Sequence, residues 1–193
     1  MNIRSLKVKG FCTTVGPVMK HSHSRRYDHP IRWPHPPLNV VLVEPEIPPN
    51  TGNIARMCAA TGSRLHLVEP LGFSIDDAKL RRAGLDYWDA IAPILHPNLD
   101  AFFARENPPR FFLYSTGGSL LYTDITYQPG DYLLFGSETR GLPDDLLARH
   151  PHLVAGIPLL TQHVRSLNLS TAAGIVVYEA IRQLQLGLNT ENG

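Results

Sequence analysis

The fold is decided near the end of the chain by the stretch Ile157-Pro-Leu-Leu-Thr-Gln-His-Val-Arg-Ser-Leu-Asn-Leu-Ser-Thr-Ala-Ala-Gly-Ile-Val-Val-Tyr-Glu-Ala180. A strand that ends at a proline is followed by a polar loop and then by a long apolar helix. The helix start carries Ser166, Asn168 and Ser170, which are residue types that cap helices. Free backbone N–H groups, hydroxyls and a guanidinium at one helix start suit a polar or anionic ligand. An ordinary, well-capped helix explains the stretch equally well, so the rest of the chain must decide.

The composition is that of an ordinary globular protein of one domain. Of the 193 residues, 43% are hydrophobic and 18% are charged. No apolar run approaches the roughly 18 residues of a membrane span, and the N-terminus lacks the apolar core of a signal peptide. Cys12 and Cys58 lack metal-ligand spacing, and no His/Cys/Asp cluster suggests a metal. We therefore expect a cytoplasmic protein without a metal and without a membrane segment.

Charge is distributed unevenly along the chain. Residues 1–37 hold seven Lys/Arg and one acid, a net +6, and the remainder holds 11 basic and 16 acidic side chains, a net −5. A basic arm on an acidic body can tether nucleic acid, and it can equally be a non-native extension or a misassigned start. The arm is rich in proline and histidine and has no helical or strand period, so we expect disorder there. A globular domain over 38–186 and a short polar tail over 187–193 would follow.

From Leu38 onward, short apolar runs alternate with helical patterns. The expected strands cover 38–43, 64–68, 110–115, 131–135 and 153–157, with a weaker candidate over 89–95. The expected helices cover 53–61, 74–84, 98–106, 143–149 and 169–186. This alternation predicts an α/β fold with a mainly parallel sheet and helices on both faces.

Polar loops with glycines or a proline follow the strands that end near Ser115, Phe135 and Ile157. Ligands of parallel sheets bind beyond the carboxyl ends of the strands. We therefore expect one site at one edge of the sheet. The chain has no G-x-G-x-x-G after its first strand, no P-loop and no G-x-S-x-G elbow, which disfavours dinucleotide, nucleoside-triphosphate and hydrolase sites of those types.

Three polar segments could carry chemistry. The first is Pro49-Asn-Thr-Gly-Asn-Ile-Ala-Arg56, in which Arg56 could clamp a phosphate. The second is Gly136-Ser-Glu-Thr-Arg-Gly141, in which two glycines let the backbone approach a ligand and Arg140 adds charge. The third is the opening stretch. Each alone is also typical of an ordinary surface loop.

Together the segments are far more specific. The order N-T-G-N-I-x-R, then F-G-x-E-x-x-G-L, then I-P…R-S-L-N-L-S-x-A resembles the three motifs of the SPOUT class of RNA methyltransferases. The segments Glu44–Asn53, Leu80–Tyr87 and Gly130–Pro143 resemble the small, single-domain tRNA 2′-O-methyltransferases of that class, which modify the wobble ribose of leucine tRNAs. The likeness runs from Leu38 to about Gln185 and leaves the basic arm uncovered.

This resemblance implies a fold, a cofactor and a reaction. In the class, the C-terminal segment threads a loop to form a trefoil knot, the knot holds S-adenosylmethionine, and the functional unit is a homodimer. Knots are very rare, so this expectation rests on the resemblance alone. The implied reaction transfers a methyl group to the ribose 2′-hydroxyl of the wobble cytidine or modified uridine of tRNA. The implied cofactor-binding residues, acting largely through backbone groups, are Tyr114, Ser115, Gly136, Ile157 and Ser166.

The residue that we expect at the reacting ribose is Arg56, with Asn53 and Ser170 fixing the geometry. Related enzymes are often described with this arginine as a general base, but a guanidinium is effectively always protonated. We therefore expect Arg56 to hold the flanking phosphate and to polarise the 2′-hydroxyl. The expected phosphate-binding residues are Arg81, Arg82, Arg140 and Arg165. The expected structural supports are Asn50, Glu138 and Asn168.

Other function classes stay open. An RNA-binding module that kept the fold would bind RNA without transfer, and a small-molecule enzyme would have no use for Arg81, Arg82 or the basic arm. Methylation of another RNA ribose is a further alternative. Incubation with labelled S-adenosylmethionine and total tRNA separates these readings.

Overall fold

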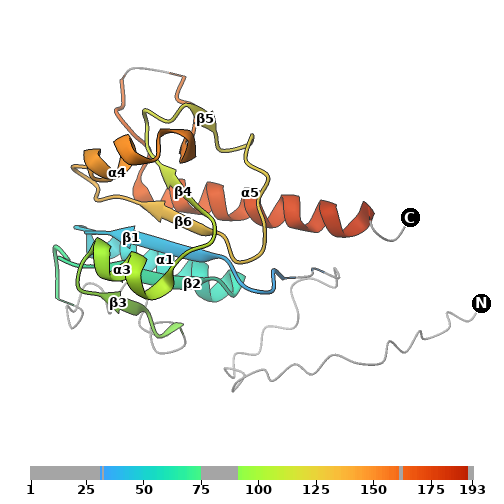
Figure 1. Ribbon diagram of the computed structural model, residues 1–193, viewed down its shortest axis with the longest axis horizontal. Coiled ribbons are helices and arrows are strands. Elements are labelled where there is room, and N and C mark those ends of the chain that lie inside the picture. Colours follow the sequence, from blue (N-terminus) through green and yellow to red (C-terminus); the bar gives the residue numbers. More distant parts are fainter. Residues whose placement is uncertain (1–30, 32, 75–90, 161–162, 191–193) are drawn as a thin grey trace, which may run out of the picture. The chain divides into compact units, whose positions relative to one another are not determined.

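A parallel sheet forms the centre of the fold (Figure 1). The computed structural model describes residues 31, 33–74, 91–160 and 163–190, which lie in one unit spanning 31–193. Within these residues, seven strands follow the order β3-β2-β1-β6-β4-β7-β5, and all neighbouring strands in this order pair in parallel. Their bounds are Asn39–Val43 (β1), Arg64–Val68 (β2), Ile94–His96 (β3), Phe111–Tyr114 (β4), Leu120–Leu121 (β5), Tyr132–Phe135 (β6) and Val154–Gly156 (β7).

Apolar residues on both faces explain why these runs form central strands. All five residues of β1 are buried, as are all four of β6, which is typical of strands covered on both sides. Successive side chains of a strand point to opposite faces. Accordingly, Val40 and Leu42 belong to one hydrophobic cluster, and Val41 and Val43 belong to the other.

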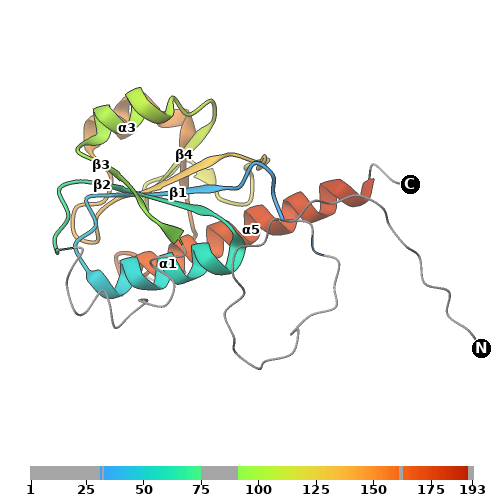
Figure 2. The same cartoon turned by 90° about the horizontal axis from the view of Figure 1, so that it is seen from below.

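Helices cover both faces (Figure 2). Helices α1 (Pro48–Thr61) and α5 (Leu169–Thr190) pack together on one face, where Ile54 and Cys58 share a cluster with Val176 and Val177. Helices α3 (Leu99–Glu106) and α4 (Asp144–Arg149) contribute Phe102 and Leu146 to the cluster on the other face. A short 3-10 helix, Pro151–Leu153, precedes β7. The predicted α/β class with helices on both faces is confirmed.

Several predicted boundaries were wrong. Helix α1 begins at Pro48 rather than near Asn53, because proline suits the first helical positions, where no N–H partner is needed. Helix α5 continues to Thr190, beyond the expected end near 186. Strand β3 is shorter and later than the predicted 89–95 strand, and the two-residue β5 was not predicted. The expected helix over 74–84, with Arg81 and Arg82, lies outside the described residues, as do residues 1–30.

Within the described part of the chain, none of the helices combines the length and the apolar character needed to cross a bilayer.

Candidate active site

A cavity of about 510 Å³ lies at the carboxyl ends of β4, β6 and β7. The loops that follow these three strands line it, together with the start of α5. The sequence predicted a site at this edge of the sheet, from the polar loops that follow Ser115, Phe135 and Ile157. The volume falls within the range of roughly 300–1,000 Å³ that is usual for small-molecule and cofactor sites.

Two stacked aromatic rings lie beneath the cavity. The Tyr114 and Phe135 ring centroids are 4.8 Å apart with an interplanar angle of 14°. The Tyr127 hydroxyl donates to the Tyr122 carbonyl at 2.8 Å, so the Tyr114 hydroxyl is the donor in its 2.9 Å bond to Tyr127. Burial raises the pKa of Tyr127 to about 12 and that of Tyr114 well above its ordinary value. Because the Tyr114 ring is engaged in the core, its backbone is the part available to a ligand.

A tight loop closes one side of the cavity. Ser137 and Gly141 exchange both backbone hydrogen bonds, at 3.2 and 2.9 Å. Gly141 has a φ of +73°, which glycine adopts readily. A Cβ atom at Gly136 would overlap the backbone of Gly141 and Leu142, so only glycine fits there.

The Glu138 carboxylate ties this loop to the start of α1. One oxygen accepts from the Glu46 N–H at 2.8 Å, and the other accepts from the Ile47 N–H at 3.3 Å and from the Asn50 amide at 2.8 Å. The three donors therefore fix both carboxylate oxygens. Asn50 lies inside the first turn of α1 and is buried.

Asn168 extends the connection to α5. Its amide donates to Asn50 Oδ1 at 2.9 Å, while its own Oδ1 accepts from the Ser170 N–H at 2.9 Å and the Ser170 hydroxyl at 2.7 Å. A weaker bond from the Thr171 N–H, at 3.4 Å, completes an N-terminal cap. The predicted cap is confirmed. We call the chain Glu138–Asn50–Asn168 the polar relay, because it links three segments that are distant in sequence.

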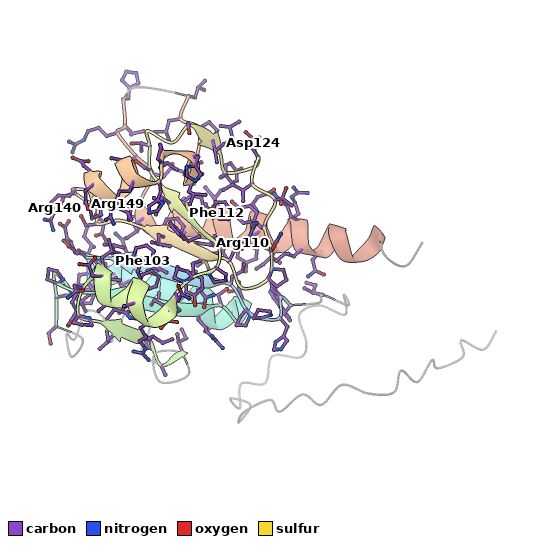
Figure 3. The ribbon with its side chains drawn as sticks, viewed as in Figure 1. Phe103, Arg110, Phe112, Asp124, Arg140 and Arg149 are labelled. Carbon is purple, nitrogen blue, oxygen red and sulfur yellow. The ribbon has the colours of Figure 1, made fainter. Side chains whose placement is uncertain are left out.

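Charged side chains lie at the rim of the cavity, among them Arg140, which is labelled at the left edge of Figure 3. Arg140 donates to Glu44 Oε2 at 2.7 Å and lies 3.9 Å from Glu46. The Thr139 hydroxyl and N–H donate to the two oxygens of Glu46 at 2.7 and 3.2 Å. Arg140 and Thr139 therefore hold the loop after β6 against the loop after β1, in addition to the hydrogen bonds of Glu138.

The structure brings most of the predicted site residues together. Those that line the cavity are Tyr114, Ser115, Gly136, Ile157, Ser166, Asn50, Glu138, Asn168, Arg140 and Arg165. The predicted catalytic residues are not among the described residues that line it. Asn53 and Arg56 are exposed on α1, and the Ser170 hydroxyl donates to Asn168. Sequence reasoning missed Glu46 and Thr139, because the E-P-E segment gave no indication of its partner.

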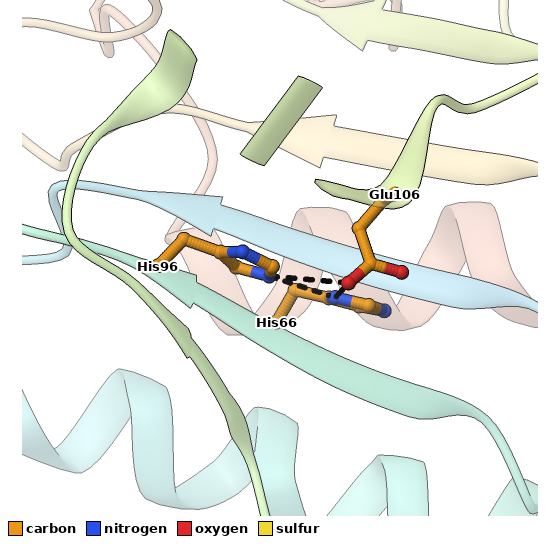
Figure 4. Close-up of side chains that lie close together, drawn as sticks. All are labelled: His66, His96 and Glu106. Carbon is orange, nitrogen blue, oxygen red and sulfur yellow. Dashed lines mark hydrogen bonds and ion pairs between the residues drawn. The ribbon is translucent and has the colours of Figure 1, made fainter. Parts of the chain in front are cut away.

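A second polar cluster lies inside the fold (Figure 4), and its three residues are not among those that line the cavity. His66, His96 and Glu106 place ligand-type atoms within 4.8 Å of one another. The Asn39 amide donates to the Gly130 carbonyl, so Asn39 Oδ1 accepts from His66 Nε2 at 3.3 Å, and His66 Nδ1 then accepts from His96 Nε2 at 3.1 Å. The fold joins groups whose spacing in the sequence, 30 residues between the histidines, gave no metal signal.

The geometry of the two rings favours a shared proton over a shared ion. The rings are within 16° of coplanar, and their 5.4 Å centroid separation equals the N···N distance plus one ring radius on each side. The nitrogens therefore face each other, whereas the ring nitrogens that bind a metal both point at the ion. Burial, with the charge of His96 and Arg64, lowers the pKa of His66 to about 3. We interpret the two histidines as a neutral, hydrogen-bonded pair in the core.

Comparisons with known proteins show the family to which the chain belongs. The family model of the SpoU rRNA methylase family matches residues 37–178. A tRNA (cytidine(34)-2′-O)-methyltransferase of Escherichia coli K12 is 54% identical over 148 residues, which cover 76% of this chain and 94% of the relative. A solved structure described as giving insights into the 2-OH methylation of C/U34 on tRNA has a TM-score of 0.71 at 49% identity, covering 76% of this chain and 95% of its own.

A further solved structure contains a cofactor. The AdoMet-bound rRNA methyltransferase of Sinorhizobium meliloti is 31% identical, with a TM-score of 0.67 and coverage of 76% of this chain and 56% of its own. The family match spans most of the chain and includes all three of the loops that build the cavity. The chain belongs to the SpoU rRNA methylase family.

Proposed function

We propose that this protein transfers a methyl group from S-adenosylmethionine to the ribose 2′-hydroxyl of nucleotide 34, the wobble position, of tRNA. The observation that carries the proposal is the cavity itself. Its walls are the loops after β4, β6 and β7, of which the last two carry motifs of the class, and they come from a chain that is 54% identical to a tRNA (cytidine(34)-2′-O)-methyltransferase.

The cavity suits the cofactor in size and in chemistry. Its lining combines small polar and glycine residues, such as Ser115 and Gly136, with apolar residues such as Leu159 and Leu169. An adenine ring fits an apolar slot with backbone donors and acceptors at its edge. We infer that Tyr114, Ser115, Gly136, Ile157 and Ser166 hold S-adenosylmethionine. When bound, the cofactor supplies a methyl group that is already activated.

The protein's own residues then have to orient the reactants and exclude water. The polar relay holds the loop after β6, the start of α1 and the start of α5 in one arrangement before any ligand arrives. Such preorganisation costs no rearrangement at the moment of reaction. We assign Asn53 and Ser170 the role of fixing this geometry, and Ser170 is hydrogen-bonded directly to Asn168 of the relay.

We propose that Arg56 holds the flanking phosphate and polarises the 2′-hydroxyl, and that the proton leaves through phosphate or water. A pH–rate profile for Arg56→Lys tests this assignment. Near-normal activity with a new pKa close to that of lysine would instead identify a true general base.

We further propose a homodimer and a trefoil knot. Arg56 is exposed on α1, away from the cavity lining of its own chain, and Tyr178 on α5 is 54% exposed. A second copy packed over α1 and α5 would cover Tyr178 and bring Arg56 to the partner's cavity. Mixing Arg56→Ala copies with Gly136→Val copies tests the pairing, because activity returns only if mixed dimers contain one intact site. The proposal of a knot rests on the family to which the chain belongs, because no contact among the described residues establishes it.

Several finer points stay predictions. These are the preference for leucine tRNAs, the cytoplasmic location and the division into an arm over 1–37, a domain over 38–186 and a tail over 187–193. Deleting residues 1–37 tests the arm: unchanged tRNA affinity rules out the tether. Arg81 and Arg82 stay in the proposed RNA-binding set with Arg140 and Arg165.

The decisive experiment uses two matched tRNAs. A leucine tRNA with cytidine at position 34 is incubated with labelled S-adenosylmethionine and the protein, and the modified ribose is mapped. The control tRNA carries 2′-deoxycytidine at position 34 and lacks the acceptor oxygen. We expect transfer to the first and none to the second. Cofactor binding and tRNA binding without transfer would leave the RNA-binding module as the correct reading.

A further inference from the structure

Glu44, which directly follows β1, has an unusual backbone. Its φ of 51° lies in the left-handed region that side chains of this kind seldom adopt. Its N–H donates to the Val68 carbonyl at 2.9 Å, so the neighbouring strand fixes the conformation. Strained positions of this type persist where the surrounding structure holds them, and they concentrate at binding sites.

The side chain of Glu44 meets Arg140 at the rim of the cavity. Glu44 Oε2 and Arg140 Nη2 are 2.7 Å apart, and Arg140 Nε lies 3.9 Å from Glu46. Arg140 is 68% exposed and lines the cavity, so RNA at this edge has access to it. Glu46 has a separate structural task, because it also binds Thr139.

A guanidinium binds a carboxylate and a phosphate with the same planar pair of donors. The two anions therefore compete for Arg140. The competition matters in this chain, because residues 38–193 carry a net charge of −5 and RNA binding must rely on local cations. While Glu44 holds Arg140, one of these cations is neutralised.

We propose that Glu44 limits RNA affinity by occupying Arg140 in the free protein, and that an RNA phosphate near the reacting nucleotide replaces it in the complex. The inference rests on the proposed function, since it requires RNA at this rim. It makes Glu44 a specificity-determining residue. A polyanion gains Arg140 only if its phosphate is positioned well enough to displace the carboxylate, so loosely bound RNA gains little.

The exchange has a distinctive dependence on salt. An arginine–phosphate contact releases about 0.7 to 0.9 of a counterion, which steepens the fall of affinity with salt. In the unmodified protein, the contact forms only where a phosphate displaces Glu44, so complexes in which Glu44 keeps Arg140 lack this contribution. In Glu44→Gln every complex can form the contact, so the slope steepens by at most about 0.7 to 0.9. Affinity at low salt rises about two- to fivefold, because exposed ion pairs are weak.

The test measures binding of an anticodon stem–loop RNA with cytidine at position 34 by fluorescence anisotropy over a salt series. The variants are Glu44→Gln, Arg140→Gln and the double variant. Asp145→Asn is the matched control, because Asp145 pairs with the exposed Arg149 at 2.9 Å on α4 and its loss changes the charge equally. We expect Glu44→Gln to tighten binding, Arg140→Gln to weaken it, and the gain to vanish in the double variant.

Three results would overturn the proposal. The first is a gain in RNA affinity equal to that of Asp145→Asn, and the second is a gain that persists when Arg140 is replaced. The third is a change in affinity for S-adenosylmethionine instead of RNA, which would identify the cofactor's carboxylate as the anion. If Glu44→Gln does not fold, Glu44→Asn replaces it, because asparagine adopts the left-handed region readily. Methyl transfer by the unmodified protein tests the function separately: an active enzyme without coupling between the two residues overturns the inference alone.

Discussion

Replacing Glu138 by glutamine should destabilise the segments that line the cavity without changing the shape of the cavity. The carboxylate accepts three hydrogen bonds, from Glu46, Ile47 and Asn50, on two oxygens. Glutamine keeps one acceptor oxygen and turns an NH₂ group toward at least one of these donors. Hydrogen bonds to a charged acceptor contribute about 1.5–3 kcal/mol each. Because Glu138 is half-buried, we expect the lower end, a loss of about 1.5–2 kcal/mol of unfolding free energy.

The same change should lower the affinity for the cofactor. The polar relay orders three segments before binding, so once it is weakened, part of the cofactor's binding free energy is used to order them. A cost of about 1.4 kcal/mol corresponds to a tenfold larger dissociation constant for S-adenosylmethionine. Urea unfolding measures the first quantity, and titration calorimetry measures the second.

The control for this experiment is Glu179→Gln. Glu179 also accepts three bonds, two from Arg182 and one from Gln183, but it lies on α5 and is not among the described residues that line the cavity. It should lose stability without losing cofactor affinity. If Glu138→Gln matches the unmodified protein in both measurements, or if Glu179→Gln weakens the cofactor equally, the relay does not preorganise the site.

Three further predictions concern single positions. The folded-state pKa of His66 is lowered to about 3 from an ordinary 6.5, so the unfolded chain binds more protons below pH 6.5, and stability should fall as the pH drops from 6.5 toward 3. Urea unfolding should show a loss of about 2 kcal/mol at pH 5 relative to pH 7.5, and an equal loss in His66→Gln would refute the assignment. Gly136→Ala should abolish cofactor binding in titration calorimetry, since its Cβ overlaps backbone, and normal affinity would show that the loop can open. Asn168→Ala should cost about 1–2 kcal/mol in thermal or urea unfolding, because it removes the cap of α5 and the bond to Asn50, and a loss below about 0.5 kcal/mol would argue against the relay.

The sequence predicted the central strands well because each is a continuous apolar run. β2 matches its expected bounds of 64–68, and β6 differs by one residue. The start of α1 was missed because Pro48 and Pro49 read as loop residues, although proline fits the first helical turn. β5, with two residues, is too short to show any period.

The site was predicted in its position and less well in its connections. Strand ends in a parallel sheet meet at one edge, so polar loops after Ser115 and Phe135 had to converge. Which side chains bond across those loops depends on tertiary contacts that no local pattern contains. Asn50 is 88 residues from Glu138 and 118 from Asn168, and the bonds among them follow only from the folded chain.

Those long separations affect the order of events when the chain folds. Parallel strand pairing and contacts between remote segments form slowly, because loop closure must precede the gain from each contact. The wall that Asn168 supports is complete only after α5 has docked on α1. Ligand that recognises the finished cavity therefore arrives too late to speed folding. It stabilises the native state alone, and so it acts by slowing the rate at which the finished protein unfolds.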